Sequence, residues 1–136
     1  MALIRNKLLE IGFTGVPPIV DTVDRFQGLE RDFIIASYTV ADSDFIRSEE
    51  DFILNPRRFN VTLTRPRSKF VMFVSQSLVQ HLPSDIDTAR AAANLQLFVT
   101  EYCNSSEQIS LPITIRNSPK LVNCQLRTPK INSSQE

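Results

Sequence analysis

The chain is poor in the residues that build metal sites, membrane spans and secreted frameworks. His81 is the sole histidine, and Cys103 and Cys124 lack paired ligand spacing, so the sequence cannot assemble a Cys/His zinc site. No apolar run reaches the roughly 18 residues that span a bilayer. The first residues lack the apolar core of a secretory signal. Two thiols without an export signal predict a reducing, intracellular setting and no membrane partner.

The sequence also lacks the segments that hold a nucleotide phosphate and its magnesium ion. It has three glycines and no Gly-x-x-x-x-Gly-Lys-Ser/Thr loop, and no Asp-Glu pair follows an apolar strand. The acids between Asp42 and Asp51 lack regular ligand spacing, which favours a solvated loop over a metal site. We therefore predict no bound metal held by this chain.

Length and charge set further limits. A chain of 136 residues suits one domain with a modest core. Its 15 basic and 15 acidic side chains give a formal net charge of zero, so no overall field attracts nucleic acid. Any binding of anions must come from local clusters.

The composition changes near residue 103. All nine Phe and both Tyr lie at or before Tyr102, and polar residues dominate beyond it. We expect residues 1–103 to fold. We expect residues 104–136 to form an extended or disordered tail, because they bury too little apolar surface to offset chain entropy. Leu111–Arg116 could form a short edge strand, although Pro112 removes a donor.

Hydrophobic periodicity in residues 1–103 predicts alternating helices and strands, hence an α/β fold with a parallel sheet flanked by helices. The predicted helices are 2–11, 55–65 and 84–102, the last capped by Ser84 with Asp87 and packing through Ala91, Leu95, Phe98 and Tyr102. The predicted strands are Ile19–Val23, Phe33–Tyr38 and Phe70–Val74, the last two covered on both faces. Residues 39–50 are predicted as a surface loop, and His81 as a surface or cap residue.

A charged cluster, Asp21–Asp32, directly follows the first predicted strand. This would place it at a strand's carboxyl end, where ligands bind in open α/β sheets. Gly28 permits a tight turn or a close backbone approach to a ligand. The Glu30 carboxylate can accept from sugar hydroxyls or pair with an arginine. A turn with Glu30 and Arg31 in solvent explains the same residues.

A basic cluster, Asn55–Arg67, holds four arginines and no acid. Arg58 and Arg65 are seven residues apart, which places them on one helical face two turns apart. Arginine suits bidentate phosphate contact and stabilises charge on a transferring phosphoryl group. A solvated basic helix, with its end charges matched to the helix dipole, is the alternative.

Together the clusters resemble motifs V and VI of superfamily 1 helicases, in the branch of the nonsense-decay and replication helicases. Val20–Ser37 is similar to motif V. Asn55–Arg67 is similar to motif VI, usually written Arg-Arg-Leu-Asn-Val-Ala-Leu-Thr-Arg-Ala-Arg. The resemblance covers about residues 1–82. It implies the carboxyl-terminal part of the second RecA-like domain, beginning after the strand and motif that normally open that domain.

The resemblance also implies roles for individual residues. Two RecA-like domains clamp ATP, and the first supplies the Walker A lysine and the Walker B carboxylates for Mg²⁺. By position, Arg65 resembles the catalytic arginine that reaches the γ-phosphate. The implied nucleotide contacts are Gln27, Gly28, Glu30, Arg65 and Arg67, and the implied nucleic-acid contacts are Thr22 and Arg58.

Three substitutions depart from the usual motif VI. Pro66 replaces alanine, removes a donor and restricts Arg65 away from helical geometry, so the helix should end early. Phe59 and Thr62 replace leucine and alanine, which a repacked core could absorb.

An arginine finger alone has no phosphate to act on. We therefore expect a carboxyl-terminal fragment of an ATP-dependent helicase motor, inactive alone. Its partners would be a Walker-bearing chain and single-stranded DNA or RNA. A non-catalytic module that binds single-stranded nucleic acid or another partner, and a decayed remnant, are the alternatives.

Overall fold

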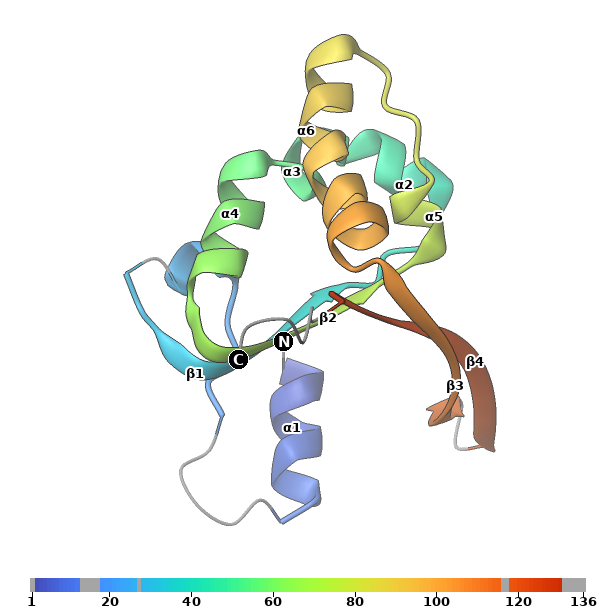
Figure 1. Cartoon of the computed structure of the whole chain (residues 1–136). Coiled ribbons are helices and arrows are strands. Elements are labelled where there is room, and N and C mark those ends of the chain that lie inside the picture. Colours follow the sequence, from blue (N-terminus) through green and yellow to red (C-terminus); the bar gives the residue numbers. More distant parts are fainter. Residues whose placement is uncertain (1, 13–17, 27, 116–117, 131–136) are drawn as a thin grey trace, which may run out of the picture. The chain divides into compact units, whose positions relative to one another are not determined.

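The computed structural model describes residues 2–12, 18–26, 28–115 and 118–130. The chain divides into two compact units, and Figure 1 labels the helices and strands. The first unit comprises Met1–Tyr38 and Pro56–Phe73, and the second comprises Thr39–Asn55 and Val74–Glu136. Within the described part of the chain, no helix combines the length and apolarity needed to cross a bilayer.

The first unit is built on a pair of parallel strands, β1 and β2. It also contains two α-helices and a short 3₁₀ helix. The predictions of a helix near residues 2–11, a helix near 55–65 and strands near 33–38 and 70–74 are therefore confirmed. Their bounds are α1 Ala2–Glu10, η1 Val23–Phe26, β1 Arg31–Tyr38, α4 Pro56–Thr64 and β2 Pro66–Val74.

Helix α4 covers one face of the strand pair. Phe59 is 5% exposed, and its ring meets the Tyr38 ring edge to face with centroids 6.3 Å apart. The opposite face of β1 is open, since Phe33 and Ile35 remain 49% and 59% exposed. Our prediction that this strand is covered on both faces was therefore wrong for the described residues. Alternate residues of β1 differ in burial because only one face has a helix against it.

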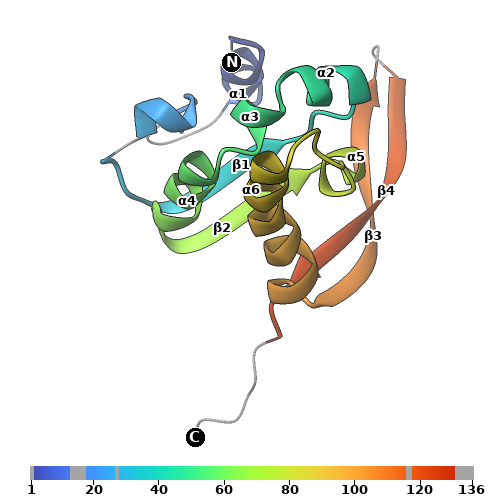
Figure 2. The same ribbon diagram turned by 90° about the horizontal axis from the view of Figure 1, so that it is seen from above.

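The second unit combines short helices with an antiparallel hairpin, seen in Figure 2 as two long strands side by side. Ile46 and Leu78 are its most deeply buried large side chains. Its elements are α2 Ser43–Ser48, α3 Glu50–Ile53, α5 Gln76–Val79, α6 Ile86–Leu97, η2 Phe98–Tyr102, β3 Ser105–Ile115 and β4 Ser118–Thr128.

A buried polar network ties α3 to the segment that leads into α6. Glu50 Oε2 lies 2.7 Å from His81 Nε2, and Glu50 Oε1 accepts from the Ser84 amide at 3.0 Å. The His81 hydrogen bond, followed by those from Ser84, holds the pKa of the Glu50 carboxyl below its ordinary value. Thr88 donates to Asp51 at 2.8 Å. His81 is therefore a buried partner of Glu50 and not the surface or cap residue that we predicted.

The segment after residue 104 is not the unpaired tail that we expected. Residues 105–115 and 118–128 pair in register, with Ile109 opposite Cys124 and Leu111 opposite Val122. Both strands place apolar side chains at alternate positions, so the pair gathers them on one face. Residues 131–136 lie outside the described part. The domain boundary predicted near residue 103 stays a prediction.

Four other local predictions were wrong at least in part. Ile19–Val23 forms no strand, and the 3₁₀ helix η1 begins at Val23. Residues 39–50 contain α2, which buries Ile46. Asp85, and not Ser84, caps α6, because its carboxylate accepts from the Asp87 and Thr88 amides. The buried residues of α6 are Thr88, Ala92 and Leu95, so only Leu95 of the predicted stripe is buried.

Candidate nucleotide-contact site

The first unit brings the two predicted clusters together. The Arg58 Nη2 donates to Asp24 Oδ2 at 3.0 Å, and the Arg67 Nε donates to Glu30 Oε2 at 3.1 Å. Between these side-chain contacts, the Arg31 amide donates to the Arg65 carbonyl at 3.1 Å. The segments 21–32 and 55–67 therefore form one site, although over thirty residues separate the members of each contact.

The site lies at the amino ends of the parallel strands. Arg31 opens β1, and Arg65 directly precedes Pro66, which opens β2. We expected the first cluster at the carboxyl end of a strand, and the absence of a strand at Ile19–Val23 overturns that placement. Because neighbouring parallel strands run the same way, their amino ends meet at one edge.

Helix α4 ends at Thr64, two residues before Pro66. Arg65 lies in a bend before β2. Proline disfavours the helical conformation of the residue before it, so Arg65 leaves the helix axis. The prediction that Pro66 keeps Arg65 out of the helix is confirmed.

The Arg65 guanidinium has an unsatisfied donor. Its Nε is buried and finds no hydrogen-bond acceptor among the residues that the structure describes. The residue as a whole keeps partial exposure. A buried N–H without a partner costs about 1–3 kcal/mol. The charge of the guanidinium suits a phosphate, although the Nε itself is covered.

Glu30 pairs with an arginine, which is one of the two roles that its carboxylate allowed. The Glu30 and Arg67 side chains are 53% and 62% exposed, and Asp32 lies 4.0 Å from the same guanidinium. A pair so exposed contributes only about 0–1 kcal/mol. Both side chains can therefore exchange this contact for a ligand at little cost.

Arg58 is not directed to solvent as a basic helix would present it. Its side chain is 26% exposed and is paired with Asp24 on η1. Sequence reasoning missed Asp24 as a functional candidate. The sequence showed that Asp24 is an acid within the first cluster. It did not show that Arg58, 34 residues away, would be its partner.

The other predicted site residues are Thr22, which precedes η1 in the sequence, and Gln27 and Gly28, which follow it. Gly28 has φ of 82°, a left-handed conformation that favours glycine, and a Cβ there would meet no atom within 4 Å. Backbone conformation, and not close packing, therefore explains this glycine. Thr22 is exposed, and its amide donates to Asp21 Oδ1 at 2.8 Å. Gln27 lies outside the described residues.

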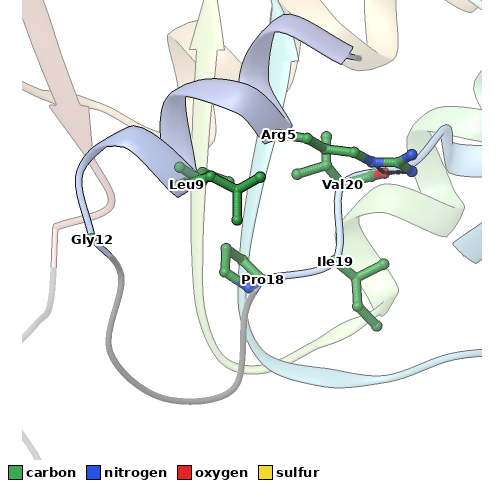
Figure 3. Close-up of a pocket in the computed structure, with 7 residues that line it drawn as sticks. Arg5, Leu9, Gly12, Pro18, Ile19 and Val20 are labelled. Atoms are coloured by element: carbon green, nitrogen blue, oxygen red, sulfur yellow. Dashed lines mark hydrogen bonds between the residues drawn. The ribbon is translucent and has the colours of Figure 1, made fainter.

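Two further features of the described residues concern ligand binding. No group of three or more His, Cys, Asp or Glu side chains within them could hold a metal ion. A pocket of about 380 Å³ lies between α1 and residues 18–20, where the Arg5 guanidinium donates to the Val20 carbonyl, as Figure 3 shows. Its lining includes none of the predicted site residues and is largely apolar. It therefore does not match the nucleotide site.

Comparison with known proteins supports the motif assignment. The family model AAA_12, described as an AAA domain, matches residues 2–77 and so includes both clusters. The DNA polymerase alpha-associated DNA helicase A of Saccharomyces cerevisiae is 39% identical over 61 residues. That alignment covers 45% of this chain and 8% of the yeast protein, so the chain spans a small part of this relative. A search of the solved structures gave no significant match. With motifs V and VI in order and in contact, the chain belongs to the AAA_12 family and carries the carboxyl-terminal part of a superfamily 1 helicase AAA domain.

Proposed function

We propose that this chain supplies motif V and the motif VI arginine of a helicase motor, and that it does not hydrolyse ATP alone. The observation that carries the proposal is the Arg65 guanidinium. It stands at the junction of the two motifs, and the described residues supply no acceptor for its buried Nε. An arginine held in this way stabilises charge on a phosphate that other groups bind.

The groups that hold ATP and Mg²⁺ would come mainly from a partner. Its sequence has no Walker A loop, and the described residues hold no cluster of metal ligands. We infer that ATP and Mg²⁺ are held mainly by a Walker-bearing RecA-like domain, and that this chain is part of a second one. Bound Mg²⁺ would neutralise phosphate charge, and Arg65 would add a positive charge at the transferred phosphate.

The remaining residues take supporting roles in this proposal. Glu30 would accept from the ribose hydroxyls, and Arg67 would then be released to bind phosphate. The segment containing Gln27 and Gly28 would couple the nucleotide to nucleic acid, with Thr22 close to the strand. An intracellular location follows, because ATP and nucleic acid are both available there.

The first test asks whether Arg65 binds a phosphate chain. The Nε–Hε resonance of Arg65, assigned with Arg65→Lys, is followed by NMR during titration with tripolyphosphate or ATP. We expect a saturable shift at Arg65 that Arg90→Gln, a charge-matched change in the second unit, leaves unchanged. A resonance that does not respond would contradict the role of Arg65.

The second test measures turnover. We expect no ATP hydrolysis by the purified chain, and hydrolysis when a Walker-bearing partner chain is added. An arginine finger contributes about 10³–10⁵-fold to the rate in other phosphoryl-transfer enzymes. Arg65→Ala should therefore abolish the reconstituted activity, while Arg90→Gln should retain it. Robust turnover by the isolated chain would overturn the proposal.

A non-catalytic module for single-stranded nucleic acid is less well supported. Arg58 on α4 and Arg67 on β2 are paired with acids of the first cluster, which neutralises part of the basic cluster. Affinity for an oligonucleotide at two salt concentrations separates the alternatives. A steep salt dependence that nucleotide does not alter would favour the module.

A further inference from the structure

We propose that Asp24 is a positioning residue, which through Arg58 fixes helix α4 against η1 and so sets the position of Arg65. The inference rests on the proposed function for its consequence at phosphate. Its structural basis is a set of contacts within the first unit. It assigns Arg58 to holding the site together and not to binding nucleic acid.

The Asp24–Arg58 pair is the best shielded of the ion pairs that cross between the two clusters. Its atoms are 3.0 Å apart, and the Arg58 side chain is 26% exposed although Asp24 is 56% exposed, whereas both members of the other pair, Arg67 and Glu30, are 62% and 53% exposed. Solvent and salt screen exposed pairs strongly and shielded pairs much less. The Asp24–Arg58 pair therefore contributes more than the Glu30–Arg67 pair to holding the clusters together.

Helix α4 transmits this contact from Arg58 to Arg65. The Thr62 hydroxyl donates to the Arg58 carbonyl at 2.9 Å, and the Thr64 hydroxyl donates to the Asn60 carbonyl at 2.9 Å. Thr62 is buried, so the middle of the helix is also held by packing. A helix fixed at its first turn and its middle holds the residue that follows its last turn.

Hydrogen exchange of the Arg31 amide reports on the position of Arg65. The Arg31 amide donates to the Arg65 carbonyl, so its hydrogen exchange depends on whether Arg65 stays in place. We expect Asp24→Asn and Arg58→Gln each to accelerate exchange of this amide about fivefold. The charge swap, Asp24→Arg with Arg58→Asp, should restore most of the protection.

Arg25→Gln is the matched control for this experiment. Arg25 lies on the same 3₁₀ helix as Asp24 and pairs with Asp21 at 3.6 Å, but its side chain is 74% exposed. We expect it to leave the exchange of the Arg31 amide unchanged. Arg58→Lys keeps the charge without the fork, and its effect should lie between wild type and Arg58→Gln.

The two possible roles of Arg58 predict different effects of the variants on oligonucleotide affinity. If Arg58 bound phosphate directly, removing Asp24 would release its charge. Asp24→Asn would then tighten binding of single-stranded DNA while Arg58→Gln weakened it. If Arg58 acts as a positioning residue, neither variant tightens binding, and both weaken the response of Arg65 to tripolyphosphate.

Opposite signs for the two variants, or an unchanged Arg31 amide in both, would overturn the inference. Thermal melts of each variant identify loss of the fold, and the charge-swap variant then decides whether the pair itself is responsible. Failure of the proposed function has a different signature. In that case the Arg65 resonance of the wild-type chain does not shift with tripolyphosphate. Hydrogen exchange of the Arg31 amide still tests the Asp24–Arg58 pair.

Discussion

Replacement of Phe59 tests how helix α4 is held on the parallel strands. Phe59 is buried, and its ring packs edge to face on Tyr38 of β1. Truncation of a buried phenylalanine to alanine costs about 3–5 kcal/mol, because transfer free energy is lost and a cavity remains. The aromatic pair itself accounts for about 0.5–1.5 kcal/mol of this.

Phe59→Leu separates the aromatic contact from burial. Leucine is the residue that motif VI usually carries at this position, and it keeps the site apolar. We expect a loss of about 1–1.5 kcal/mol, since a smaller side chain remains buried but the ring contact is gone. Combining it with Tyr38→Leu should cost less than the sum of the single changes by about 0.5–1.5 kcal/mol.

Urea unfolding provides the measurement. The sequence has no tryptophan and two tyrosines, so in a Tyr102→Phe background the fluorescence of Tyr38 reports on the first unit. This probe serves the Phe59 variants, and far-UV circular dichroism serves the variants that lack Tyr38. A cost below about 1 kcal/mol for Phe59→Ala, or strict additivity in the double variant, would refute this account of the packing.

Three further predictions concern other contacts. Because hydrogen bonds lower the pKa of Glu50 in the folded state, its contribution to stability is present above its ordinary pKa of 4.5 and is lost as the pH falls through the folded value. Glu50→Gln should therefore flatten the acid limb of a plot of stability against pH, and an unchanged limb would contradict the network. The exposed Glu30–Arg67 pair should contribute no more than about 1 kcal/mol, so Arg67→Gln should change the urea midpoint little and less still in 1 M salt. Pro112 and Pro119 stand on register pairs of the hairpin that are two apart, and neither can donate to an added strand. Replacing both with threonine should promote concentration-dependent association in sedimentation experiments, and a monomeric variant would argue against this protective role.

The helices and strands that strong local patterns specify could be predicted from the sequence. Residues of α4 and β2 were found because hydrophobic periodicity and an apolar run near Phe70 mark them. The hairpin was missed because its apolar residues alternate with polar ones, which lowers the average hydrophobicity. Alternation between Ile109 and Ile115 was the signal that could have revealed it.

The site was only partly predictable. Motif resemblance identified segments 21–32 and 55–67, and the structure joined them. The sequence did not indicate that Arg58 would face Asp24 or that Arg67 would face Glu30, because each pair is separated by more than thirty residues. The predicted position at a strand's carboxyl end failed because β-branched residues at 19–23 raise strand propensity without a neighbouring strand to pair with.

The sequence alone carried the resemblance to the family, the arginine at position 65 and the lack of a phosphate loop in its 136 residues, because these depend only on the order of the residues. Tertiary structure alone decided which arginines pair with acids and which donor nitrogens are buried. Charge pairing depends on distance and burial, and both arise only when segments remote in sequence pack together.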